Sequence, residues 1–196
     1  LPPNNYQISF HDVMVGEGEV YPGKELAINP GQVYGDLDGV ATKDPTFGLE
    51  SVWIDPGQRS DAQAMGYTVV DCSTVIATHL SHLIKSRAAE LIGQDGVQQL
   101  LDKLAQSAPR LVENLVPKLL DLGQVTKVMQ NLLAEGIPIR DVRTIAEALA
   151  EQGAKSQDTD ALTARVRVAL GRAICQSVTG VGREMTAITL DPQLEQ

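Results

Sequence analysis

Two histidines three residues apart are the closest approach in this 196-residue chain to a catalytic or metal-binding motif. His79 and His82 fall within a predicted helix, where positions i and i+3 lie on the same side. A zinc site would need a third and a fourth donor, but the sequence has no HExxH motif and offers only Cys72 or a stray carboxylate nearby. The pair is better explained as two polar positions flanking a buried stripe, so no metal or other cofactor is expected.

Cys72 is placed where a nucleophile could be activated, because it directly precedes the predicted helix and a helix dipole can lower the pKa of a thiol. It also ends an apolar strand, which favours burial, and the sequence lacks a GxSxG elbow. The run Gly16-Glu17-Gly18-Glu19 is acidic where a phosphate-binding loop should be neutral or basic. These observations predict a protein that is not an enzyme; an enzyme that uses Cys72 or the histidines is kept as an alternative.

The charge of the chain argues against nucleic acid and anionic membranes as partners. The net charge is −9: residues 1–91 hold 5 Lys and Arg against 12 Asp and Glu, and residues 92–196 hold 11 against 13. An acidic surface repels phosphate groups. Five arginines make the helical half locally basic, but DNA binding would require a stronger positive field. They are Arg140, Arg143, Arg165, Arg167 and Arg172. A protein partner fits this composition better.

Composition and cysteine usage predict an ordinary globular chain. Hydrophobic residues make up 43% and charged residues 21%, and no apolar run approaches the roughly 20 residues that a membrane-spanning helix needs. We therefore expect no membrane contact by these residues themselves. Cys72 and Cys175 are far apart and lack metal-site spacing, which favours a reduced, cytosolic setting. The chain begins with Leu1, so we expect it to be an excerpt of a longer protein.

The segment Asp44-Pro45-Thr46-Phe47-Gly48-Leu49 predicts a rigid turn. The Asp44 carboxylate can accept hydrogen bonds from backbone amides, while Pro45 presets φ at a position that needs no donor. Phe47, one of two phenylalanines, would project from this turn. The residues alone leave open whether its ring fills the core of a small sheet or faces solvent.

In the first half of the chain, hydrophobic periodicity predicts short strands and one long helix. Residues 6–15 alternate apolar and polar, as in a half-buried strand, and residues 16–19 should bend the chain. Further strands are predicted around Trp53 and at 67–70. A helix capped by Ser73 or Thr74 should then continue to Gly93, with apolar side chains at three- and four-residue intervals. These are Val75, Ile76, Ala77, Leu80, Leu83, Ile84, Ala88, Leu91 and Ile92.

The second half is predicted to be helical. The expected helices are 96–107, 109–121, 123–135, 141–152 and 160–177. Pro117 should interrupt the second of them, and Asp141 should cap the fourth. Residues 184–190 alternate like a strand. The predicted fold class is α+β, with small mixed β-sheet subdomains followed by a helical subdomain.

Four segments in unbroken order carry a resemblance to a known family. They are Ala27-Ile28-Asn29-Pro30-Gly31, the turn at 44–49, Val75-Ile76-Ala77-Thr78-His79-Leu80, and the run from Ile137 to Ile145. Together they span more than half of the chain, and they resemble the cytoplasmic domain of the type III secretion export-gate family, in its flagellar branch. The intact Asp-Pro-x-Phe-Gly-Leu turn favours the flagellar branch over an injectisome export gate of a virulence system, which is kept as the alternative.

The resemblance implies a division into subdomains. By the family pattern, residues 1–22 and 72–91 form a mixed α/β subdomain that is incomplete at its start, 23–71 an inserted β-rich subdomain, 92–171 a helical subdomain, and 172–196 the beginning of a truncated C-terminal subdomain. The parent would be an integral membrane protein whose cytoplasmic part lies at the inner face of the bacterial inner membrane and assembles into a homo-oligomeric ring.

The resemblance also implies a docking function: binding of flagellar export chaperones that carry filament-type substrates, together with other export-apparatus proteins. Asp44, Phe47 and Thr78 match the family positions most tied to chaperone contact, and Val70 and Val75 match apolar lining positions. We expect Asp44 and Thr78 to lie at the rim of an apolar depression and to orient the partner. Removing either the Asp44 carboxylate or the Phe47 ring should then abolish binding without changing stability.

Overall fold

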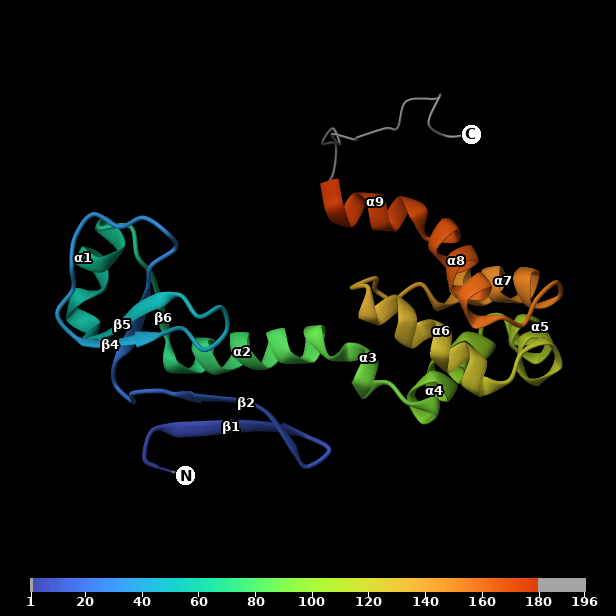
Figure 1. Ribbon diagram of the computed structural model, residues 1–196, viewed down its shortest axis with the longest axis horizontal. Helices are drawn as coiled ribbons and strands as arrows, with labels where there is room; N and C mark the ends of the chain where they lie inside the picture. Colours follow the sequence, from blue (N-terminus) through green and yellow to red (C-terminus); the bar gives the residue numbers. More distant parts are fainter. Residues whose placement is uncertain (1, 180–196) are drawn as a thin grey trace. The chain divides into compact units, whose positions relative to one another are not determined.

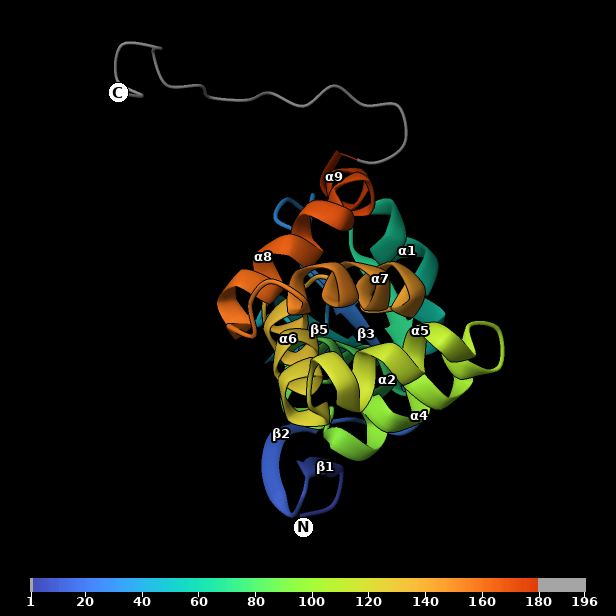
Figure 2. The ribbon, with the colours of Figure 1, turned by 90° about the vertical axis from the view of Figure 1, so that its right-hand side faces the viewer.

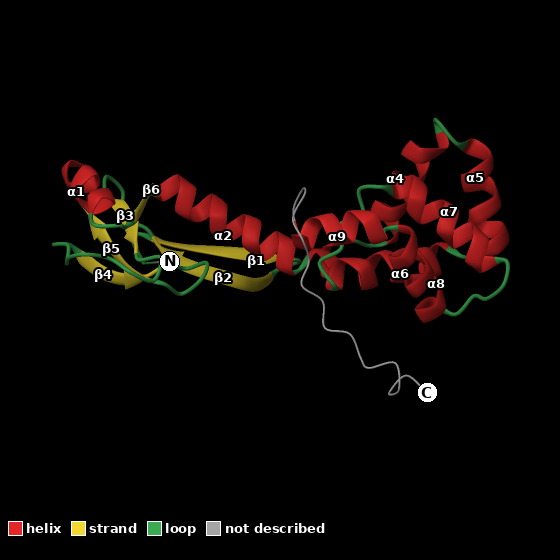
Figure 3. Cartoon of the chain, turned by 90° about the horizontal axis from the view of Figure 1, so that it is seen from above, coloured by secondary structure: helices red, strands yellow, loops and turns green. Residues whose placement is uncertain are grey.

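The computed structural model describes residues 2–179, and its internal contacts divide the chain into two compact units, one ending at Arg87 and one beginning at Ala88 (Figure 1). Among the described residues the strands belong to the first unit, while helices make up the second (Figure 3). The α+β fold class is therefore confirmed, although every strand pair in this part of the chain is antiparallel rather than mixed. The strand predicted at 184–190 lies outside the described residues.

A two-stranded hairpin opens the first unit. Strand β1 (Asn5–Phe10) pairs with β2 (Val13–Glu19), and the two-residue turn between them places His11 and Asp12 at φ of 49° and 64°. Both residues thus occupy the left-handed region that a tight hairpin turn requires. The prediction of one strand over 6–15 with a bend at 16–19 is wrong: the chain reverses at His11 and Asp12, and Gly16 and Gly18 lie within β2.

The second sheet of this unit has four antiparallel strands in the order β4-β5-β3-β6. Their bounds are β3 (Glu25–Ile28), β4 (Val40–Lys43), β5 (Glu50–Ile54) and β6 (Thr68–Asp71). A 3-10 turn η1 (Pro56–Gln58) and helix α1 (Arg59–Ala64) connect β5 to β6. The strands predicted around Trp53 and at 67–70 are confirmed.

Side chains on the two faces of this sheet are buried in separate clusters, because successive residues of a strand point to opposite faces. Ala27, Ile54 and Val69 pack with Ala62 of α1 on one face. On the other face, Leu26 and Trp53 pack with Val75 of α2. The sheet is thus held between two helices.

Helix α2 (Cys72–Ser86) follows β6 directly. Its cap is Asp71, whose carboxylate accepts a hydrogen bond from the Thr74 amide at 2.7 Å, so the predicted cap at Ser73 or Thr74 is wrong. The predicted single helix to Gly93 is also wrong, because α2 ends at Ser86, its C-cap Arg87 is non-helical (φ −115°), and a separate short helix α3 (Ala88–Leu91) follows.

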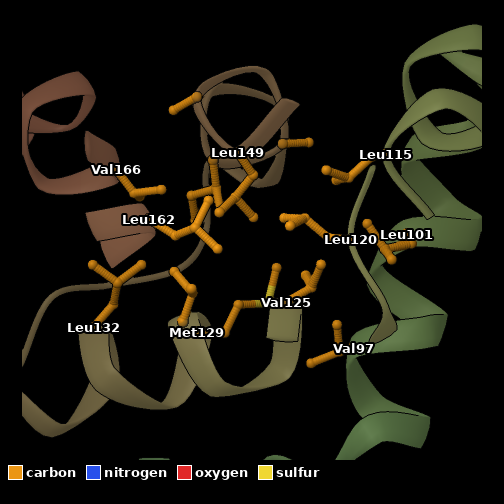
Figure 4. Close-up of a cluster of buried hydrophobic side chains, with 14 of the residues drawn as sticks. Val97, Leu101, Leu115, Leu120, Val125, Met129, Leu132, Leu149, Leu162 and Val166 are labelled. Atoms are coloured by element: carbon orange, nitrogen blue, oxygen red, sulfur yellow. The ribbon is translucent and has the colours of Figure 1, made fainter. Parts of the chain in front are cut away.

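The second unit consists of α3 and further helices around one apolar core, and Figure 2 shows helix α7 from the side. They are α4 (Gln94–Ala105), α5 (Pro109–Glu113), a π-helical turn η2 (Asn114–Leu119), α6 (Leu122–Ala134), α7 (Val142–Gly153), α8 (Thr159–Ala169) and α9 (Gly171–Thr179). Side chains from α4 to α8, including Leu101, Val125, Leu149 and Leu162, fill the core (Figure 4).

Aspartates and a proline set the helix boundaries in this unit. The Asp141 carboxylate accepts from the Thr144 amide at 3.0 Å, which confirms the predicted cap. The predicted interruption at Pro117 is confirmed too, because η2 contains a cis Val116–Pro117 bond and an extended Val116. The predicted helix 160–177 is instead two helices that meet at Leu170, where Gly171 has low helix propensity and the Leu170 side chain is buried in the core.

Candidate functional site

The turn between β4 and β5 is closed by hydrogen bonds from its own backbone and from one carboxylate. Asp44 Oδ2 accepts from the amides of Thr46 at 3.2 Å and Phe47 at 2.6 Å. The Gly48 amide donates to the Asp44 carbonyl at 2.8 Å, and the Asp44 amide donates to the Leu49 carbonyl at 2.8 Å. Gly48 takes a φ of 70°, where a residue without a side chain is favoured. The amide-accepting role predicted for Asp44 is therefore present.

Asp44 itself is buried, with 5% of its surface exposed. The expectation that its carboxylate stands at a rim and contacts a partner does not fit this geometry. One carboxylate oxygen holds two amides of the turn, and the side chain has little surface to offer. Asp44 therefore acts on the site through the conformation of the turn.

Phe47 projects from this turn with 65% of its surface exposed. Its ring lies edge-on against the His82 ring of α2, with ring centroids 5.4 Å apart and an interplanar angle of 72°. The turn does not need the ring as an apolar anchor, because hydrogen bonds to Asp44 already close it. The sequence left the exposure of Phe47 open, and the structure places the ring in solvent.

Beside Phe47 lies a groove of about 400 Å³ along α2, here called the α2 groove. Its helix-side residues recur every three or four positions, as one face of a helix requires. The small side chains of Ala77 and Ser81 leave room next to the Phe47 ring. The lining residues are Phe47, Thr74, Ala77, Thr78, Ser81, His82 and Lys85.

The predicted site residues divide between this groove and the protein interior. Phe47 and Thr78 line the α2 groove. Val75 does not, because it is 2% exposed and packs against Leu26 and Trp53 behind the helix. Val70 is half-buried against the same cluster, so the two valines position α2 instead of lining the groove.

Sequence reasoning missed five lining residues: Thr74, Ala77, Ser81, His82 and Lys85. A signal for them was available. Once Thr78 is placed on an exposed helix face, Thr74, Ser81, His82 and Lys85 lie on or near that face at three, four and seven residues, and Ala77 lies four residues before Ser81.

His79 and His82 have different surroundings although they are three residues apart. His79 is 5% exposed, and its Nδ1 lies 2.8 Å from the hydroxyl of Tyr6 on β1. Burial lowers the pKa of His79, and burial together with the nearby Asp44 charge raises the pKa of Tyr6 to about 12, so the phenol keeps its proton. His82 is exposed and lines the groove. No cluster of metal-ligating side chains occurs among the residues that the structure describes.

Cys72 lies in a setting that disfavours the reactive thiolate. Its Sγ contacts the Tyr21 carbonyl at 3.2 Å, and burial raises the pKa of the thiol. The protonated Cys72 thiol donates a hydrogen bond to a carbonyl, which is a structural role. It is not activated as a nucleophile. Within residues 2–179, no helix is both long enough and apolar enough to cross a bilayer.

Solved structures with the same architecture define the class of the chain. The structure of the Chlamydia pneumoniae CdsV and CdsO protein complex contains a chain that superposes with a TM-score of 0.82 at 27% identity, covering 100% of this chain and 59% of that one. The nonameric EscV cytosolic domain from the type III secretion system matches with a TM-score of 0.61 at 23% identity, over 86% of this chain and 50% of that one. The fold is that of the cytoplasmic domain of a type III export-gate protein.

The family model of FHIPEP matches residues 1–196, and the chain belongs to the FHIPEP family. It is 52% identical over 196 residues to the flagellar biosynthesis protein FlhA of Escherichia coli K12 and 50% identical to that of Salmonella typhimurium LT2. Each alignment covers 100% of this chain. The chain spans 28% of the length of these two curated relatives.

Proposed function

We propose that this chain is part of the cytoplasmic docking platform of a flagellar type III protein export gate, where it binds chaperone–substrate complexes for export across the inner membrane. The observation that carries this proposal is the exposed Phe47 ring, fixed by a hydrogen-bonded turn beside the α2 groove. An exposed aromatic ring that is held in place beside a groove supplies the kind of anchor that a binding surface needs.

The α2 groove suits an apolar side chain on a partner helix. Burying one such side chain against Phe47 contributes on the order of 2 kcal/mol. The loss of translational and rotational freedom on association opposes that gain. Binding through this groove should therefore be modest in affinity and readily reversible, which fits a platform that receives cargo and passes it on.

The flagellar assignment rests on sequence identity. The relatives that are 50 and 52% identical are flagellar biosynthesis proteins. The structural neighbour named for a type III secretion system is 23% identical, which supports the shared fold alone. An injectisome export gate is the second candidate, and selective binding of injectisome chaperones in place of flagellar ones would favour it.

The proposed setting is a ring at the cytoplasmic face of the inner membrane. Its partners are flagellar export chaperones with filament-type substrates and other export-apparatus proteins. The structure of CdsV in complex with CdsO supports apparatus contacts of this kind. The role is one of binding rather than catalysis: the half-buried Cys72 thiol and the Tyr6–His79 pair serve structure.

The proposal predicts that Phe47→Ala weakens binding of a flagellar chaperone bound to its filament protein. Removing the ring should cost about 2 kcal/mol of binding free energy, which raises Kd about 30-fold. Isothermal titration calorimetry measures this change. The melting temperature should stay nearly unchanged, because the ring is 65% exposed.

Tyr34→Ala is the matched control, since Tyr34 is an aromatic residue with 76% exposure that does not line the groove. It should leave the affinity at the wild-type value. An unchanged Kd for Phe47→Ala would overturn the proposal, and a melting point lowered by many degrees would show that the ring supports the fold instead.

A further inference from the structure

Lys85 brings a positive charge to the α2 groove within an acidic unit. Residues 1–87 hold 5 Lys and Arg against 11 Asp and Glu. Other cations of this unit are neutralised: Lys24 pairs with Asp55 at 2.8 Å, Lys43 with Glu50 at 3.4 Å, and Arg59 with Glu25. The Lys85 ammonium, by contrast, forms no ion pair or hydrogen bond with any residue in the described range 2–179, although acids outnumber bases around it.

The position of Lys85 along the helix gives the groove an aromatic end, at Phe47 and His82, and a cationic end, at Lys85. His82 lies against the Phe47 ring, and Lys85 follows three residues later on the same face, roughly 4.5 Å further along the axis. No other lining residue falls between His82 and Lys85 along the helix, so nothing in the lining separates the aromatic end from the cationic end. An occupant that covers Phe47 with an apolar side chain therefore brings its next helical turn to Lys85.

We propose that the α2 groove selects an amphipathic helix in which the apolar anchor against Phe47 is accompanied, three or four residues away, by an Asp or Glu that pairs with Lys85. Side chains at this spacing share one face of a helix and lie about 5 to 6 Å apart, which matches the step from His82 to Lys85. This inference rests on the proposed function and adds the chemistry of the partner: a carboxylate one turn from the anchor.

Charge pairs at the edge of an interface act chiefly on recognition and on the salt dependence of association, and they add modestly to affinity. The expected preference for the acidic partner is therefore about two- to fivefold in Kd at low ionic strength, and it should shrink as salt is added.

The test uses two synthetic helical peptides of about 16 residues that carry one tyrosine anchor and, four residues later, either glutamate or glutamine. Fluorescence polarisation at low and physiological salt gives their Kd values for the wild-type chain, Lys85→Gln and Phe47→Ala. The wild type should prefer the glutamate peptide by about two- to fivefold, and Lys85→Gln should bind both peptides equally. Lys43→Gln, which removes an exposed lysine outside the groove, should keep the preference.

The outcomes separate this inference from the proposed function. If Phe47→Ala weakens both peptides while the wild type binds them equally, the groove is used but the pairing with Lys85 is overturned. If Phe47→Ala binds as the wild type does, the proposed function fails. If neither peptide binds, a flagellar chaperone–filament complex is titrated across salt concentrations: a smaller salt dependence for Lys85→Gln than for wild type supports the inference, and equal salt dependence overturns it.

Discussion

Asp44 and Phe47, three residues apart in one turn, have opposite exposures: 5% and 65%. The sequence predicts the reason for the turn, because an aspartate before a proline can hold the following amides. It does not predict which way the ring points. That depends on the Phe47–His82 contact with α2, which is distant in sequence. The expected rim position of Asp44 failed because the same carboxylate oxygen that closes the turn is withdrawn from solvent.

Burial of Asp44 changes what its substitution should do. Asp44→Ala leaves the Thr46 and Phe47 amides without their acceptor, which costs about 1 to 2 kcal/mol. The free energy of unfolding measured with urea should fall by that amount, in contrast to the unchanged stability expected from sequence alone. Chaperone binding should weaken as well, because Phe47 loses its fixed position.

Asp44→Asn is the matched control, since it keeps one carbonyl oxygen that can accept from the two amides. It should retain most of the stability and of the binding. Equal stability of wild type and Asp44→Ala would show that the turn is held by its backbone hydrogen bonds alone.

At the scale of elements, the hairpin and helix α2 depend on each other. Tyr6 of β1 reaches His79 of α2, and Gly16 and Gly18 of β2 leave space for these side chains. A Cβ at Gly18 would stand 2.6 Å from the Tyr6 hydroxyl oxygen. The sequence offered these glycines as a bend because glycine is common in turns, yet here they permit close packing.

Gly16→Ala should destabilise the first unit. A Cβ at this position would lie 2.6 Å from Leu83 Cδ1 and 3.1 Å from two His79 ring atoms, so α2 or the hairpin must shift. Overpacking of this kind costs about 1 to 3 kcal/mol. The loss of stability is measured by urea unfolding, followed by the fluorescence of Trp53, the single tryptophan. Gly57→Ala, where an added Cβ meets nothing within 4 Å, is the control, and equal midpoints for the two variants would refute the packing argument.

Helix prediction succeeded where local signals decide and failed where packing does. Helices α4, α6 and α7 lie within two residues of their predicted bounds, because capping residues and apolar periodicity act locally. The breaks at Arg87 and Leu170 have no proline and follow continuous apolar patterns, so the sequence merged the helices on either side.

At the scale of the whole molecule, the chain has separate hydrophobic cores. The clusters around Trp53 and Ile54 draw on residues up to 75, and the helical core draws on residues from 92 onward. The compact units that the structure shows meet between Arg87 and Ala88. The finer division of the first unit into 1–22 with 72–91 and an inserted 23–71 stays a prediction.

Separate cores predict separate unfolding. Leu149 is fully buried in the helical core, and Leu149→Ala should cost about 2 to 5 kcal/mol there. Far-ultraviolet circular dichroism, dominated by the helical unit, should then report an earlier urea midpoint, while Trp53 fluorescence should report an unchanged one. Val75→Ala, which removes a contact of Trp53, is the reciprocal control and should move the fluorescence midpoint alone. If both probes shift together in either variant, the two units unfold as one cooperative body.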